Sequence, residues 1–132
     1  MKKVFFFLLV VLLSNWATAQ ITDYSIFDKK FNFYVANDLG RNGYYDQKPI
    51  AELMGTMAEE VGPEFVVATG DIHHFEGVRS VNYPLWMTNY ELIYSHPELM
   101  IDWFPVLGNH EYRGNTQAVM DYTNISRRWT MP

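Results

Sequence analysis

Carboxylate, amide and imidazole side chains follow three short apolar runs of this sequence. The first run leads to Asp38, the second to Asp71, and the third to Asn109 with His110 beside it. These oxygen and nitrogen donors are ligands for cations such as iron, zinc or manganese. Three strands that end side by side in such groups would form a metal site. Two carboxylates, an amide and nearby imidazoles would suit a pair of cations roughly 3.5–4 Å apart, with Asp71 shared between them.

Strands and crossovers are needed to bring these side chains together. Strands are predicted at 31–36, 65–69 and 103–107, because each stretch is short, apolar or aromatic, and followed by turn residues. The three ligand positions are separated by 33 and 38 residues. Each interval is long enough for one helical crossover.

Helices are predicted between the strands. The clearest begins at an Asp46 cap and ends at Gly62-Pro63. Its apolar side chains recur at helical spacing, at Ile50, Leu53, Met54, Met57, Ala58 and Val61. Further helices are predicted at 84–97 and 115–128, and the Trp and Tyr side chains of 83–94 are expected in the core.

The resulting order is strand, helix, strand, helix, strand, helix. This alternation predicts an α/β fold with a parallel sheet and right-handed crossovers. Ligands of such sheets bind outside the carboxyl ends of the strands. Asp38, Asp71 and Asn109 are all predicted at that edge.

The first 19 residues have the features of a cleaved secretory signal. Lys2 and Lys3 precede ten apolar residues at 4–13, and Ala17-Thr18-Ala19 is a small-x-small cleavage site. A membrane anchor is the alternative, but ten residues fall short of the roughly 20 that span a bilayer. We therefore expect a secreted or periplasmic protein without a membrane anchor after cleavage. Residues 20–132 would form part of one domain.

The charge and the absence of cysteine exclude several classes of site. Without residues 1–19 the chain has 8 basic and 15 acidic residues, a net charge of −7. Nucleic-acid binding needs a basic surface, so no such surface is expected. The chain has no cysteine, which excludes disulfides and thiolate metal sites.

Three stretches in order resemble the first three sequence blocks of the calcineurin-like metallophosphoesterases. They are Asp38-Leu39-Gly40, Gly70-Asp71-Ile72-His73-His74 and Gly108-Asn109-His110-Glu111. The surroundings are most similar to the purple acid phosphatase branch, because Gly40 stands where most of the superfamily has histidine. The resemblance covers most of residues 31–117. It implies the N-terminal part of an α/β/β/α sandwich.

The resemblance also implies a role for each motif residue. Asp38 would bind the first cation, Asp71 would bridge both, and Asn109 would bind the second. His110 would donate a hydrogen bond to phosphate or protonate the leaving alkoxide, and Glu111 would orient His110. The implied reaction is hydrolysis of a phosphate monoester by a metal-bound hydroxide. The substrate would be a phosphorylated small molecule or phosphoprotein.

One position departs from the family pattern. Purple enzymes have a tyrosine three residues after the bridging aspartate, and its phenolate gives iron(III) its colour. Here that position is His74. As a ligand, His74 would compensate for the histidine missing from the first block, and the metal pair could then be divalent and the protein not purple. The alternatives place His74 just outside the metals or give its role to His73.

Other interpretations of these residues stay open. Asp38 could be a turn residue and Asp71 a helix cap. Arg41 and Arg113 flank the predicted site and could contact phosphate, but exposed arginines are common. The protein could also be a phosphodiesterase or nucleotidase of the same superfamily. A further alternative is a secreted binding module that keeps the scaffold without its metals.

The family's later blocks, a lone histidine and a Gly-His-x-His, have no counterpart after Asn115. A binuclear site of this type would want about seven protein ligands, and fewer are present. We therefore expect this chain to be the N-terminal portion of a longer enzyme. Alone, it should bind metal weakly and turn over poorly.

Overall fold

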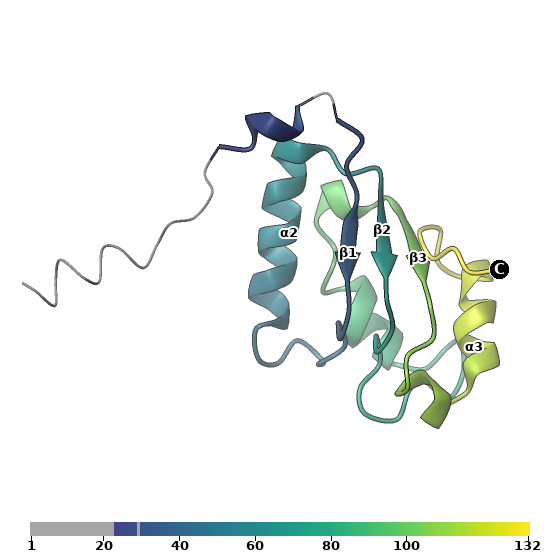
Figure 1. The fold of residues 1–132 in the computed structure, drawn as a ribbon. Coiled ribbons are helices and arrows are strands. Elements are labelled where there is room, and N and C mark those ends of the chain that lie inside the picture. Colours follow the sequence, from purple (N-terminus) through teal and green to yellow (C-terminus); the bar gives the residue numbers. More distant parts are fainter. Residues whose placement is uncertain (1–22, 29) are drawn as a thin grey trace, which may run out of the picture.

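Three parallel strands form the centre of the fold in the computed structural model, which describes residues 23–28 and 30–132. The strands β1 (Tyr34–Ala36), β2 (Phe65–Ala68) and β3 (Asp102–Pro105) lie in the order β1-β2-β3 (Figure 1). The predicted α/β class and parallel sheet are confirmed, although each strand is shorter than predicted. The predicted signal at residues 1–19 lies outside the described residues.

The helix α2 (Gln47–Val61) follows the first strand, as predicted. It ends at Gly62, which adopts a left-handed φ of 56° and donates its N–H to the Ala58 carbonyl. Asp46 is the N-cap residue, as predicted, but its side chain makes no capping hydrogen bond. The chain instead enters the helix from a turn in which the Gln47 carboxamide oxygen accepts the N–H groups of Arg41 and Gly43.

The buried face of α2 is displaced from the predicted apolar stripe. The helix buries Gln47, Ala51, Gly55 and Ala58. Ile50 and Leu53 are about half exposed. His96 packs so closely on Gly55 that a Cβ there would lie 2.3 Å from the imidazole. Close approach therefore selects small residues for the inner face.

The second and third predicted helices are broken into shorter pieces. The second is a π-helical segment, Trp86–Glu91, and a 3₁₀ turn, Pro97–Leu99. The third is α3 (Thr116–Asp121) followed by a 3₁₀ turn at Tyr122–Asn124. The predicted continuation to residue 128 is wrong, because residues 125–128 form turns and Trp129 then makes a parallel bridge with Trp103 of β3.

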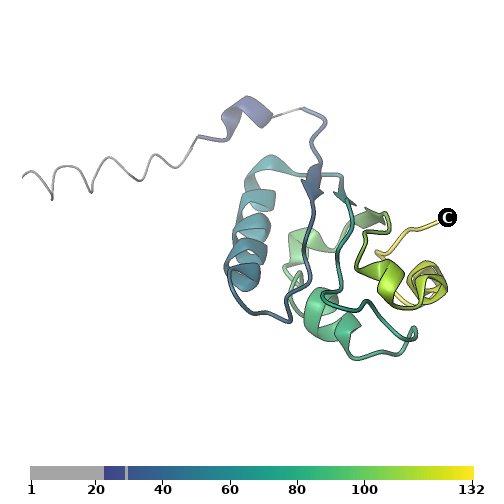
Figure 2. The ribbon, with the colours of Figure 1, turned by 60° about the horizontal axis from the view of Figure 1, so that its bottom comes forward.

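The core lies on the sheet face that the helices cover (Figures 1 and 2). The indole of Trp86 stacks on the Tyr122 ring at 3.6 Å, and Trp129 meets Trp86 edge-on. The buried aromatic side chains within 83–94 are Trp86, Tyr90 and Tyr94, which confirms their expected place in the core.

The opposite sheet face is apolar and open. Val35, Phe65 and Phe104 point to this side, and Val35 is 64% exposed. The Phe65 ring contacts Phe33 and Phe104 at centroid distances of 5.1 and 5.5 Å. In the part of the chain that the structure describes, no element packs on this face. A second sheet, as in the sandwich implied by the sequence, would bury it.

Among residues 23–28 and 30–132, no helix is long and apolar enough to cross a membrane.

Candidate metal centre

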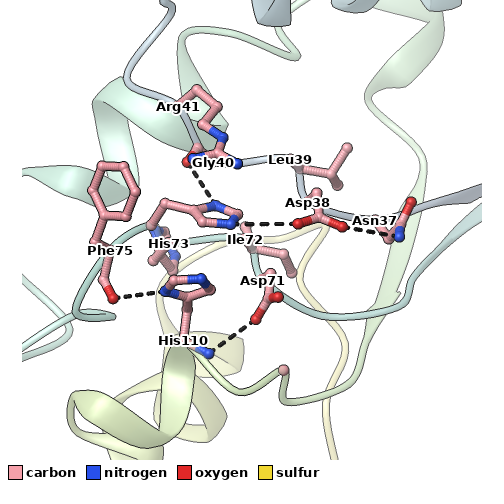
Figure 3. A network of polar contacts seen from close by, with 12 residues as sticks. Asn37, Asp38, Leu39, Gly40, Arg41, Asp71, Ile72, His73, Phe75 and His110 are labelled. Carbon is pink, nitrogen blue, oxygen red and sulfur yellow. Dashed lines mark hydrogen bonds and ion pairs between the residues drawn. The ribbon is translucent and has the colours of Figure 1, made fainter.

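The loops that follow the three strands meet at the carboxyl edge of the sheet. The backbone N–H of Asp38 donates to the Gly70 carbonyl, and that of Gly40 donates to the Asp71 carbonyl. The Asp71 carboxylate accepts the N–H of His110 at 2.9 Å (Figure 3). The three predicted ligand loops are therefore tied together by hydrogen bonds.

Two features of the backbone bring the aspartates into place. Asp38 and Asp71 both have left-handed φ angles, 53° and 54°. Non-glycine residues adopt this region uncommonly, and such conformations concentrate at functional sites. At Gly108, a Cβ would lie 2.2 Å from an Asp71 carboxylate oxygen. Glycine is required there because the third loop passes directly against the Asp71 side chain.

Three of the predicted residues form a cluster suited to a cation. Potential ligand atoms of Asp71, His74 and His110 all lie within 4.8 Å of one another. The nearest Asp38 carboxylate oxygen is 3.4 Å from His74 Nε2. The structure thus brings Asp38, Asp71 and His74 together, as predicted from sequence, and adds His110 to the group.

The orientation of His74 leaves a lone pair facing the carboxylates. Its Nδ1 lies 2.9 Å from the Gly40 carbonyl oxygen, which has no proton, so Nδ1 must be the donor. Burial lowers the pKa of His74, and the positive charge of Arg41 lowers it further. In the neutral ring Nε2 is therefore unprotonated, and it faces Asp38 Oδ1. A cation between these two atoms would accept a lone pair from each of them.

His110 is held by the loop after β2. Its Nδ1 lies 2.7 Å from the Phe75 carbonyl oxygen and 3.3 Å from an Arg113 nitrogen. A neutral ring nitrogen cannot both donate and accept, and the shorter contact, to an acceptor without a proton, assigns the proton to Nδ1. Nε2 is then the nitrogen available to a substrate or cation.

Glu111 has a different role from the predicted one. Its carboxylate is buried and accepts four backbone N–H groups, those of Asp71, Ile72, His73 and Gly108, at 2.8–3.0 Å. The prediction that Glu111 orients His110 is wrong, because both oxygens are occupied by these amides. Glu111 instead joins the second and third ligand loops. No sequence signal distinguishes this role from the predicted one.

The two adjacent histidines lie in different environments. His73 is fully buried, with its ring edge-on to Trp86 at 4.4 Å and its Nδ1 3.4 Å from the Asn89 amide nitrogen. Burial lowers the pKa of His73 to about 3. Only His74 of the two is in the cluster, so the geometry favours His74 over His73 as the ligand.

The remaining predicted residues lie in or just after the loops that carry the cluster. Asn109 is exposed in the third loop, between Gly108 and His110. Arg113 donates to the Phe75 carbonyl at 3.3 Å. Arg41 lines a cleft of about 500 Å³ together with aromatic side chains that sequence reasoning did not single out.

Comparison with known proteins gives one consistent family. The family model of the calcineurin-like phosphoesterases matches residues 31–132. Purple acid phosphatase 7 of Arabidopsis thaliana is 36% identical over 102 residues, which cover 77% of this chain and 31% of that protein. Purple acid phosphatase 3 of the same plant is 34% identical over 92% of this chain and 35% of its own. The chain thus spans about a third of the length of these relatives.

Animal proteins and one solved structure are also similar. Human tartrate-resistant acid phosphatase type 5 is 33% identical over 73 residues, 54% of this chain and 22% of that protein. The solved structure of GAP50, the anchor in the inner membrane complex of Plasmodium, matches with a TM-score of 0.60 and 26% identity. That match covers 66% of this chain and 28% of the other.

Proposed function

Since the chain belongs to the calcineurin-like phosphoesterase family, we propose that the full-length gene product hydrolyses phosphate monoesters with two bound cations. The observation that carries this proposal is the position of His74 Nε2, which lies 3.4 Å from the Asp38 carboxylate and belongs to one cluster with Asp71. This donor set of imidazole and carboxylate suits iron, zinc or manganese.

In this proposal each ligand has a separate place. Asp38 and His74 would hold one cation, Asn109 would hold the other, and Asp71 would contribute to both. The bound cations would polarise the phosphoryl oxygens and supply a nucleophilic water. The Gly40 carbonyl keeps His74 in the tautomer that can bind a cation, as carbonyls commonly do for metal-ligating histidines.

His110 is placed to move a proton. Phe75 fixes the ring through Nδ1, so Nε2 is directed away from this backbone contact. In its protonated form, Nε2 would donate to the phosphoryl group or to the departing oxygen of the ester. Substrates would be phosphorylated small molecules or phosphoproteins.

The activity can be tested on the full-length gene product. Chelation should abolish phosphomonoesterase activity, and Mn²⁺, Zn²⁺ or Fe²⁺ should restore it. Asp71→Asn should lower kcat at least 100-fold, since it removes the shared charge. Asp102→Asn, at the exposed start of β3, is the matched control and should retain activity. Chelator-resistant hydrolysis in the wild type would refute the proposal.

The role of His74 has a spectroscopic test. We infer a divalent metal pair without the colour of a tyrosinate–iron(III) bond. In the iron(III)-loaded protein, His74→Tyr should gain a visible absorption band that the wild type lacks. Phe75→Tyr, which adds a phenol one residue further on, should not. A band in the wild type, or none in His74→Tyr at full iron occupancy, would contradict the assignment.

A binding module without metals is the second candidate, and the match to the GAP50 anchor favours it. Full-length protein that binds no cation and hydrolyses no phosphate ester would support this candidate.

We also propose a secreted or periplasmic location. N-terminal sequencing of the exported protein should then begin at Gln20.

A further inference from the structure

A cleft with aromatic walls adjoins the metal cluster. Its lining comprises three aromatic side chains, Tyr44, Tyr45 and Phe75, together with Gly40, Arg41, Asn42 and His74. Because His74 belongs to the cluster, the cleft and the candidate metal centre share a wall. Its volume, about 500 Å³, is in the range of small-molecule sites.

The aromatic rings of the cleft are unusually exposed. The exposed fractions are 71% for Tyr44, 81% for Tyr45 and 64% for Phe75. Tyr45 also has a left-handed φ of 55°, which is rare for a bulky residue. Three open rings around one hollow provide an apolar surface that a flat ligand could cover.

Charge and position further define the ligand. The Arg41 guanidinium lies over the Phe75 ring at 5.5 Å from its centroid, so the cleft wall is both aromatic and positively charged. The Phe75 ring is 6.1 Å from His110, and its carbonyl holds His110 Nδ1 (Figure 3). A group that occupies the cleft therefore lies next to the residue proposed to protonate the departing oxygen.

We propose that this cleft binds the aromatic ring of an aryl phosphate ester, as the leaving-group subsite of the proposed phosphomonoesterase. The inference rests on that proposed function. In the reaction, water adds its oxygen to phosphorus, the bond from phosphorus to the aryl oxygen breaks, and a proton joins the aryl oxygen to give a phenol and phosphate. Stacking on Phe75 or Tyr45 favours a flat ring over a saturated ring of similar size.

Two non-hydrolysable probes separate ring recognition from leaving-group chemistry. Phenylphosphonate and cyclohexylphosphonate have the same headgroup and similar size, and neither has an ester bond. Calorimetry on the Mn²⁺-loaded full-length gene product should give a Kd for phenylphosphonate about two- to tenfold lower, the range expected for aromatic stacking. Phe75→Leu and Tyr45→Leu should bring the two Kd values together. Tyr112→Leu, an equally exposed ring outside the cleft lining, should leave their ratio unchanged.

The outcomes distinguish a failure of the aromatic subsite from a failure of the proposed phosphomonoesterase function. Metal-dependent binding of both phosphonates with equal Kd values would overturn the aromatic subsite and leave the proposed function intact. A preference for phenylphosphonate that survives both cleft variants would also overturn it. If neither phosphonate binds in a metal-dependent way, the proposed function fails and the subsite with it.

Discussion

Glu111→Gln is the substitution in the site that we expect to lower the free energy of unfolding most. The carboxylate accepts four backbone N–H groups, two on each oxygen. A glutamine of the same shape keeps one accepting oxygen, and its NH₂ group cannot accept the other two. Hydrogen bonds to charged groups contribute about 1.5–3 kcal/mol each. The loss of two predicts a decrease of about 3–6 kcal/mol in the free energy of unfolding.

Urea unfolding of the full-length gene product, followed by tryptophan fluorescence, would measure this loss. Hydrogen exchange would locate it, because the amides of Asp71, Ile72, His73 and Gly108 should exchange faster in Glu111→Gln. Glu60→Gln, on the exposed side of α2, is the matched control and should change the stability by about 0.5 kcal/mol at most. A Glu111→Gln protein as stable as this control, with unchanged exchange at the four amides, would refute the role assigned to Glu111.

Two further predictions concern stability. Arg128→Met should destabilise the fold by about 3–5 kcal/mol in urea unfolding. The reason is that the buried guanidinium pairs with Glu91 at 3.0 Å and lies over the Tyr90 ring. A change below about 1 kcal/mol would contradict this. The pKa of His73 is about 3 in the fold, against 6.5 for the free side chain. The contribution of His73 to the free energy of unfolding is therefore constant above pH 6.5. Below that pH only the unfolded state gains the proton, so stability falls by about 1.4 kcal/mol per pH unit. His73→Gln should show a correspondingly smaller slope between pH 6 and 4.5, and an equal slope would refute the argument.

The parallel sheet and its ligand edge follow from the sequence because their signals are local. Short apolar runs that end in Asp38, Asp71 and Asn109 identify strands and the edge where ligands gather. The period of α2 is also local. The choice of its buried face is not local, because it depends on the packing of His96 against Gly55, a residue 41 positions earlier in the chain.

Tertiary contacts likewise determine the roles of Glu111 and Arg128 and the position of the aromatic cleft, which the sequence alone does not predict. The carboxylate of Glu111 follows a histidine in the motif, yet its partners are backbone amides up to 40 residues away. Arg128 lies in a stretch with helical composition, but its guanidinium fits between Glu91 and the core aromatics. The aromatic cleft joins residues 40–45 to Phe75, which only the meeting of the first two ligand loops reveals.

A crystal of the full-length gene product soaked in Mn²⁺ tests the central claim most directly. An anomalous-scattering map should show a cation within coordination distance, roughly 2.0–2.3 Å, of His74 Nε2 and of carboxylate oxygens from Asp38 and Asp71. A second cation should share Asp71 and approach Asn109. A map with no peak at these side chains, despite Mn²⁺ bound elsewhere in the crystal, would contradict the account.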